Sequence, residues 1–157
     1  LKKEAQWNHE HEENGMKILL PIDGSKHSIK ACDYIIKHLN MFNADGVKLV
    51  VLNVQTDNIP PEVMQYIPPK SIAKWYDSQA ELSLKAGVAK LKKAGVTFEV
   101  VKKTGHISDT ILEQAKKMKA DLIVMGSHGR GALMNLFMGS IATQVLAQAK
   151  QPVLIIR

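Results

Sequence analysis

Short apolar segments alternate with longer amphipathic segments along the chain, and this alternation limits the fold more than any other feature of the sequence. Apolar runs of this length are typical of strands buried on both faces of a parallel sheet, and such strands are joined by right-handed helical crossovers. The sequence therefore predicts a doubly wound α/β fold with five parallel strands in the order 3-2-1-4-5. The expected strands are residues 17–22, 47–54, 96–102, 122–125 and 153–156, and the expected helices cover residues 28–41, 71–94, about 108–118 and 140–149. Gly95 stands where a C-terminal cap of the second helix belongs, and Ser108 could cap the third helix. Residues 55–70 contain four prolines and are expected to form a long irregular connection.

A glycine-rich stretch follows the apolar strand at residues 122–125. Gly126, Gly129 and Gly139 are followed by Ser140, where the next amphipathic segment begins. Glycines let backbone N–H groups approach an anion, and a helix N-terminus supplies donors and a favourable dipole. The spacing matches neither the dinucleotide motif GxGxxG nor the Walker motif GxxxxGK[ST]. On spacing alone, the stretch indicates either a phosphate-binding loop or a plain turn.

A second turn, Pro21-Ile22-Asp23-Gly24-Ser25, follows the first strand. Asp23 has two interpretations, as a cap for the following helix or as a ligand for a ribose hydroxyl or a phosphate-bound cation. In the strand order 3-2-1-4-5, the switch point lies between the first and fourth strands, and ligands bind at the carboxyl ends of the strands there. Because the two turns follow these two strands, we expect them to lie together.

The stretch ADLIVMGSHGRG with the later Gly-Ser pair resembles the universal stress protein family, in particular its ATP-binding branch with the signature G-x2-G-x9-G-[ST]. The resemblance extends over residues 16–157, from MKILLPIDGS to QPVLIIR. It implies one domain with a flavodoxin-like or Rossmann-like fold, preceded by an extension at residues 1–15. It also implies a stress-response module that binds ATP, or ADP or AMP, with or without Mg²⁺.

The resemblance implies a role for individual residues of this chain. The phosphates would be held by Gly126, Gly129, Gly139 and Ser140, with Met125 and Ile141 contributing backbone and packing around them. Asp23 would meet the ribose or a nucleotide-bound Mg²⁺, Val54 would bond adenine through its backbone, and Pro21 would pack nearby. Ser127 and Arg130 would add contacts, unless Arg130 points to solvent, and His128 would be an ordinary loop residue. No catalytic residue and no protein-held metal are expected.

Two alternatives to a nucleotide-binding module belong to other classes of protein. A dedicated hydrolase is disfavoured because no Walker lysine follows the glycines and no nucleophile–base pair is recognisable, which leaves slow ATP turnover at most. A partner-binding scaffold without nucleotide is disfavoured because the glycine signature is complete. A flavodoxin-like FMN protein would carry its phosphate loop after the first strand, where Asp23-Gly24-Ser25 is too sparse.

Composition excludes further classes. The chain of 157 residues is 45% hydrophobic and contains no apolar run long enough for a membrane span, so we expect a cytoplasmic protein. The net charge of +6 comes from dispersed lysines without interleaved aromatic residues, so no nucleic-acid partner is expected. Residues 1–15 show no periodicity and are predicted to be a flexible extension. The single cysteine, Cys32, falls among apolar helix positions and is predicted to be a buried, inert thiol.

The C-terminal apolar strand carries a prediction about assembly. Residues 153–156 form the last strand of the predicted sheet, and therefore an edge that a neighbouring strand would normally cover. Arg157 is the only charged residue that follows it. We expect a homodimer in which residues 153–157 of two subunits pair about a two-fold axis, as the family resemblance also implies. The alternative is a monomer whose edge is shielded by the preceding helix and the extension.

Overall fold

A computed structural model describes residues 15–42, 46–131 and 137–157 of the chain. The predicted N-terminal extension therefore lies outside the described residues, apart from Gly15. The strands are β1 (Met16–Pro21), β2 (Val47–Gln55), β3 (Phe98–Thr104), β4 (Leu122–Gly126) and β5 (Val153–Ile156). The helices are α1 (Lys26–Phe42), α2 (Pro61–Met64), α3 (Pro69–Lys93), α4 (Ile107–Lys117) and α5 (Ser140–Gln148). Within the described residues, no helix is both long enough and apolar enough to cross a membrane.

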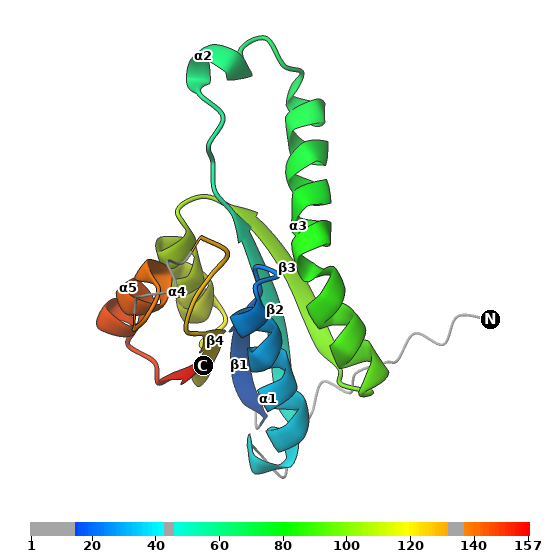
Figure 1. The fold of residues 1–157 in the computed structure, drawn as a ribbon, viewed down its shortest axis with the longest axis vertical. Coiled ribbons are helices and arrows are strands. Elements are labelled where there is room, and N and C mark those ends of the chain that lie inside the picture. Colours follow the sequence, from blue (N-terminus) through cyan, green and yellow to red (C-terminus); the bar gives the residue numbers. More distant parts are fainter. Residues whose placement is uncertain (1–14, 43–45, 132–136) are drawn as a thin grey trace, which may run out of the picture.

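The strands form one sheet in the order β3-β2-β1-β4-β5, and every neighbouring pair is parallel. The predicted doubly wound fold and its strand order 3-2-1-4-5 are thus confirmed. Helices α1 and α3 pack on one face of the sheet, and α4 and α5 pack on the other (Figure 1). This arrangement follows from the sequence because strands that are apolar on both sides need a helical layer on each face.

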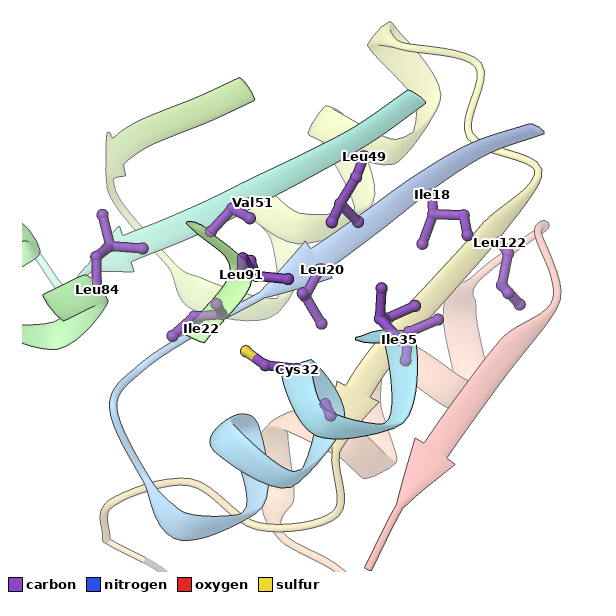
Figure 2. Close-up of a cluster of buried hydrophobic side chains, with 12 residues drawn as sticks. Ile18, Leu20, Ile22, Cys32, Ile35, Leu49, Val51, Leu84, Leu91 and Leu122 are labelled. Atoms are coloured by element: carbon purple, nitrogen blue, oxygen red, sulfur yellow. The ribbon is translucent and has the colours of Figure 1, made fainter. Parts of the chain in front are cut away.

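Side chains of β1 alternate between two cores. Ile18 and Leu20 point into a cluster with residues of α1 and α3, whereas Leu19 belongs to the cluster under α4 and α5. Figure 2 shows the first cluster, in which Cys32 and Ile35 from α1 face the strands. Cys32 is completely buried, as predicted, and its burial raises the pKa of the thiol to about 12. The thiol is therefore protonated and unreactive in the folded protein.

Helix ends show where the sequence patterns were sufficient and where they failed. The predicted glycine cap of α3 is confirmed, because Gly95 has a φ of +70° and the N–H of Val96 donates to Leu91 O at 3.0 Å. The prediction that Ser108 caps α4 is wrong. His106 occupies the cap position, and the buried Ser108 instead donates its hydroxyl to Gln144 Oε1 at 2.8 Å. Ser108 therefore joins α4 to α5.

The connection between β2 and the following long helix is more regular than predicted. It contains the single-turn helix α2, and α3 begins at Pro69. Proline is favoured at the first helical position, which explains the earlier start. Helix α2 and the first turns of α3 project beyond the carboxyl ends of the strands (Figure 1). At the base of this projection, Tyr76 donates its hydroxyl to Asp57 Oδ1 at 3.0 Å.

Candidate functional site

A cavity of about 500 Å³ opens at the carboxyl ends of β1, β2 and β4. This position is the switch point of the sheet, because the chain runs from β1 outward to β2 on one side and returns to β4 on the other. Ten of the residues predicted from the sequence line the cavity: Pro21, Asp23, Val54, Met125, Gly126, Gly129, Arg130, Gly139, Ser140 and Ile141. Ser127, which was also predicted, does not line it.

Asp23 ties the two predicted turns together. Its Oδ1 accepts the Ser25 N–H at 2.9 Å, and its Oδ2 accepts the Arg130 N–H of the glycine loop at 3.1 Å. A Cβ atom added at Gly129 would lie 2.9 Å from the same Oδ2, so the glycine is what allows this approach. The two accepted bonds fix the carboxylate but leave lone pairs for a further donor, such as a ribose hydroxyl or metal-bound water.

Gly126 and Gly139 permit close packing of the loop itself. A Cβ at Gly126 would lie 2.5 Å from the carbonyl carbon of His27, and one at Gly139 would lie 3.2 Å from Ser127 O. The Gly139 N–H donates to Ser127 O at 2.8 Å. This amide therefore closes the loop rather than pointing at a ligand. Both glycines, which were expected at the phosphates, therefore also have a packing role that their spacing in the sequence does not indicate.

Ser127 is turned toward the protein, whereas His128 also lines the cavity. Ser127 is 1% exposed, and its Oγ lies 2.9 Å from His128 Nδ1. The Ser25 hydroxyl donates to His128 O at 3.2 Å. The His27 and His128 rings lie 5.0 Å apart, and the pKa of His27 is lowered, chiefly by burial and further by His128. These contacts lock the start of the glycine loop against α1.

The N-terminus of α5 forms part of the cavity wall. Gly139 is the cap residue, and no side chain caps the helix. The Thr143 N–H donates to Gly139 O at 3.0 Å, so the preceding amides of residues 140–142 have no intrahelical acceptor. Ser140 adds a hydroxyl at the same place, and it is exposed. This end of the cavity therefore offers donors and a positive dipole end to an anion.

Several lining residues were missed by the sequence analysis. Asn53, Gln55 and Ser83 supply polar groups, and Leu52, Ile107 and Ile111 supply an apolar wall next to Val54. Asn53 is 1% exposed and donates to Ile22 O at 2.7 Å. A signal for Asn53 was present, since it is a polar residue near the end of the mostly apolar strand expected at residues 47–54, and Gln55 follows directly after that strand. Ser83 carried no such signal, because one serine among the residues of a long helix is unremarkable in sequence.

The cavity has few charged groups. Among the described residues that line it, Asp23 carries the only carboxylate and Arg130 the only guanidinium, and no lysine is present. Within the described residues, no group of three or more His, Cys, Asp or Glu side chains is placed to hold a metal ion. The arrangement combines an apolar wall, a helix N-terminus without a side-chain cap, and the Asp23 carboxylate.

Comparisons with known proteins match this architecture. The family described as the universal stress protein family matches residues 16–157. A universal stress protein of Methanocaldococcus jannaschii is 30% identical over 142 residues, which cover 90% of this chain and 81% of that protein. One from Bacillus subtilis is 28% identical over 148 residues, which cover 90% of this chain and 98% of that protein.

Solved structures show the same fold. The universal stress protein UspA of Lactobacillus plantarum has a TM-score of 0.74 and 21% identity, covering 90% of this chain and 97% of that chain. A universal stress protein in complex with cAMP has a TM-score of 0.66 and 22% identity, with coverages of 90% and 97%. A family member from Arabidopsis thaliana with AMP bound has a TM-score of 0.62 and 22% identity, with coverages of 90% and 90%.

Proposed function

The chain belongs to the universal stress protein family, and from this premise we propose that it binds an adenine nucleotide, ATP in the first instance, in the cavity between β1 and β4. ADP and AMP are the related ligands. We propose that the bound nucleotide makes the protein a regulatory or protective module in a stress response. One observation carries the proposal: the cavity joins an apolar wall to a helix N-terminus at the switch point of the sheet.

The residues that line the cavity fit the parts of an adenine nucleotide. A volume of about 500 Å³ lies within the range of small-molecule sites. The side chains of Val54, Ile107 and Ile111 would pack against the planar base. Asp23 would accept a ribose hydroxyl, and the N-terminus of α5 would face the phosphates. Relatives solved with AMP and with cAMP support the class of ligand.

The proposal is tested by identifying and then titrating the ligand. Mass spectrometry of small molecules released from the purified protein is expected to show an adenine nucleotide. Calorimetry on the emptied protein should give an affinity for ATP in the micromolar range, with GTP as the control for the base. Magnesium should act only with the nucleotide and should not bind alone, because no metal-binding cluster is found among the described residues. Undetectable binding of all adenine nucleotides would contradict the proposal.

Hydrolysis of ATP is expected to be very slow, far below the ~1–10³ s⁻¹ of dedicated enzymes. Asp23 is the only carboxylate among the described residues that line the cavity, and both of its oxygens already accept backbone N–H groups. Phosphate release is the measurement, with Gly129→Val protein as the control for contaminating ATPase. A steady-state rate within the enzymatic range that disappears in that variant would favour the hydrolase alternative.

We also propose that two copies pair through β5. This strand pairs with β4 on one side, and no other described strand pairs with its free edge. Pro152 O and Ile156 O accept N–H groups from the β4 side, so the N–H and C=O of Ile155 face away from β4. The side chains of β5 are only half-buried. Phe137 is 75% exposed and lies beneath the Arg157 guanidinium. An exposed apolar edge of this kind is normally covered.

A single substitution tests the dimer. The intact chain is expected to sediment as a dimer at tens of micromolar, and Ile155→Pro as a monomer, because proline removes the outward N–H without touching the bonds to β4. Circular dichroism should be native in both proteins. Deletion of residues 153–157 should leave insoluble or monomeric protein. An intact chain that sediments as a monomer would rule the interface out.

A further inference from the structure

Ser83, on helix α3, connects two walls of the cavity. Its Oγ donates to Gln79 O at 2.8 Å, accepts from Gln55 Nε2 at 3.2 Å, and accepts from Arg130 Nη2. A hydroxyl has one hydrogen and two lone pairs, so these three bonds saturate it. Ser83 is 1% exposed, which means that water does not compete for these positions. The hydroxyl is therefore a fixed acceptor for the guanidinium.

Gln55 is fixed in turn by Asn53. The buried Asn53 donates Nδ2 to Ile22 O, a carbonyl that can only accept, so its Oδ1 faces Gln55. Gln55 Nε2 donates to this Oδ1 at 2.8 Å and to Ser83 Oγ. The chain of bonds runs from β1 through β2 and α3 to the glycine loop. Each orientation follows from the previous one, so the donor and the acceptor of every bond in the network are assigned.

Of the described residues that line the cavity, Arg130 is the only basic one apart from His128, and Asp23 is the only acidic one. Within the described residues, the Arg130 guanidinium forms no ion pair with a carboxylate, and its side-chain hydrogen bond goes to the neutral Ser83. A guanidinium has five N–H donors, and most of them are not used by Ser83. Without Arg130, the cavity would carry a net negative charge and would repel phosphate groups.

We propose that Ser83 is a positioning residue that holds the Arg130 guanidinium over the cavity, so that the site selects phosphorylated nucleotides over the uncharged nucleoside. This inference rests on the proposed function and adds which residues make the site prefer a nucleotide to a nucleoside. Arginine loses considerable rotamer freedom when it is ordered. Because Ser83 orders the Arg130 side chain before the ligand binds, the entropy lost in ordering that side chain does not weaken the binding of the phosphates.

The inference is tested with the unmodified chain, two single variants and their double variant, each measured with two ligands. Affinities for ATP and adenosine are measured by calorimetry, with competition for the weaker ligand. Arg130→Gln should weaken the affinity for ATP about tenfold, because a charge-assisted hydrogen bond to phosphate is lost, and should change the affinity for adenosine by less than about twofold. Ser83→Ala should weaken the affinity for ATP about three- to tenfold and leave the affinity for adenosine unchanged. The double variant should bind ATP no more weakly than Arg130→Gln alone, because Ser83 acts only through Arg130.

Ser78→Ala is the matched control, since Ser78 lies on the same helix and its hydroxyl donates to Trp75 O at 2.7 Å on the exposed side. It should leave both affinities unchanged. Ser83→Cys, which is nearly isosteric and a weak acceptor, serves if the alanine variant does not fold. Equal weakening of ATP and adenosine, additive losses in the double variant, or tighter ATP binding by Ser83→Ala would overturn the inference. Absence of any nucleotide binding by the unmodified chain would instead overturn the proposed function.

Discussion

Replacing Gly126 with valine is expected to destabilise the protein by at least about 3 kcal/mol, which corresponds to a fall in melting temperature of roughly 6–12 °C. The added Cβ would lie 2.5 Å from His27 C and 2.7 Å from Ser28 N, both of which are backbone atoms at the start of α1. Backbone atoms cannot move aside as the end of a flexible side chain can. Accommodating valine therefore requires α1 to shift away from β4.

Thermal unfolding followed by circular dichroism measures this effect. Gly131→Ala is the matched control for stability, because an added Cβ there meets no atom of the described residues within 4 Å. It should change the free energy of unfolding by less than about 0.5 kcal/mol. If Gly126→Val melts at the temperature of the unmodified chain, the close packing of α1 against the end of β4 is not a constraint on this position.

Replacing Gly129 with valine is expected to weaken ATP binding by at least about tenfold while affecting stability much less. The added Cβ would lie 2.9 Å from Asp23 Oδ2, the atom that accepts the Arg130 N–H. The isopropyl group would displace Asp23, break its bond to the loop, and occupy space at the cavity wall. Gly129 itself is exposed, so the chain can relax around the substitution without losing core packing.

Calorimetry with ATP measures the second effect, and Ala86→Val on the exposed surface of α3 is the control for added bulk. If Gly129→Val binds ATP as tightly as the unmodified chain, the glycine loop does not contact the ligand. The two valine variants together separate two uses of one motif. Gly126 serves mainly the packing of the fold, whereas Gly129 serves the shape of the cavity.

The elements of this fold could be predicted because their signals are local. The apolar run at residues 122–125 indicates a strand buried on both faces, and the structure places β4 in the interior of the sheet. Gly95 indicates the end of a long helix because the residue after a helix C-terminus often adopts a positive φ, a conformation that favours glycine. The error at Ser108 has the opposite cause. A serine near a helix start can cap it or bond elsewhere, and here Gln144 from α5 offered the partner.

The position of the cavity was also predictable, because topology places the ends of β1 and β4 together and the chemistry of both turns was visible. Ser127 shows the limit of this reasoning. It belongs to the glycine loop by sequence, but its side chain turns inward to His128. Which way a loop side chain points depends on packing against other elements, and no local pattern contains that information.

By itself, the sequence determined the order and type of the elements other than α2, the sheet topology and the two turns that border the cavity. The reason is that the period of the apolar residues and the positions of the glycines are local features that extend over a few residues. Only the tertiary structure decided which polar groups face one another. Gln55, Ser83 and Arg130 lie on β2, α3 and the glycine loop, and they meet because the sheet brings these segments together. A hydrogen bond needs its two atoms within about 3 Å. That distance is a property of the folded arrangement rather than of any segment alone.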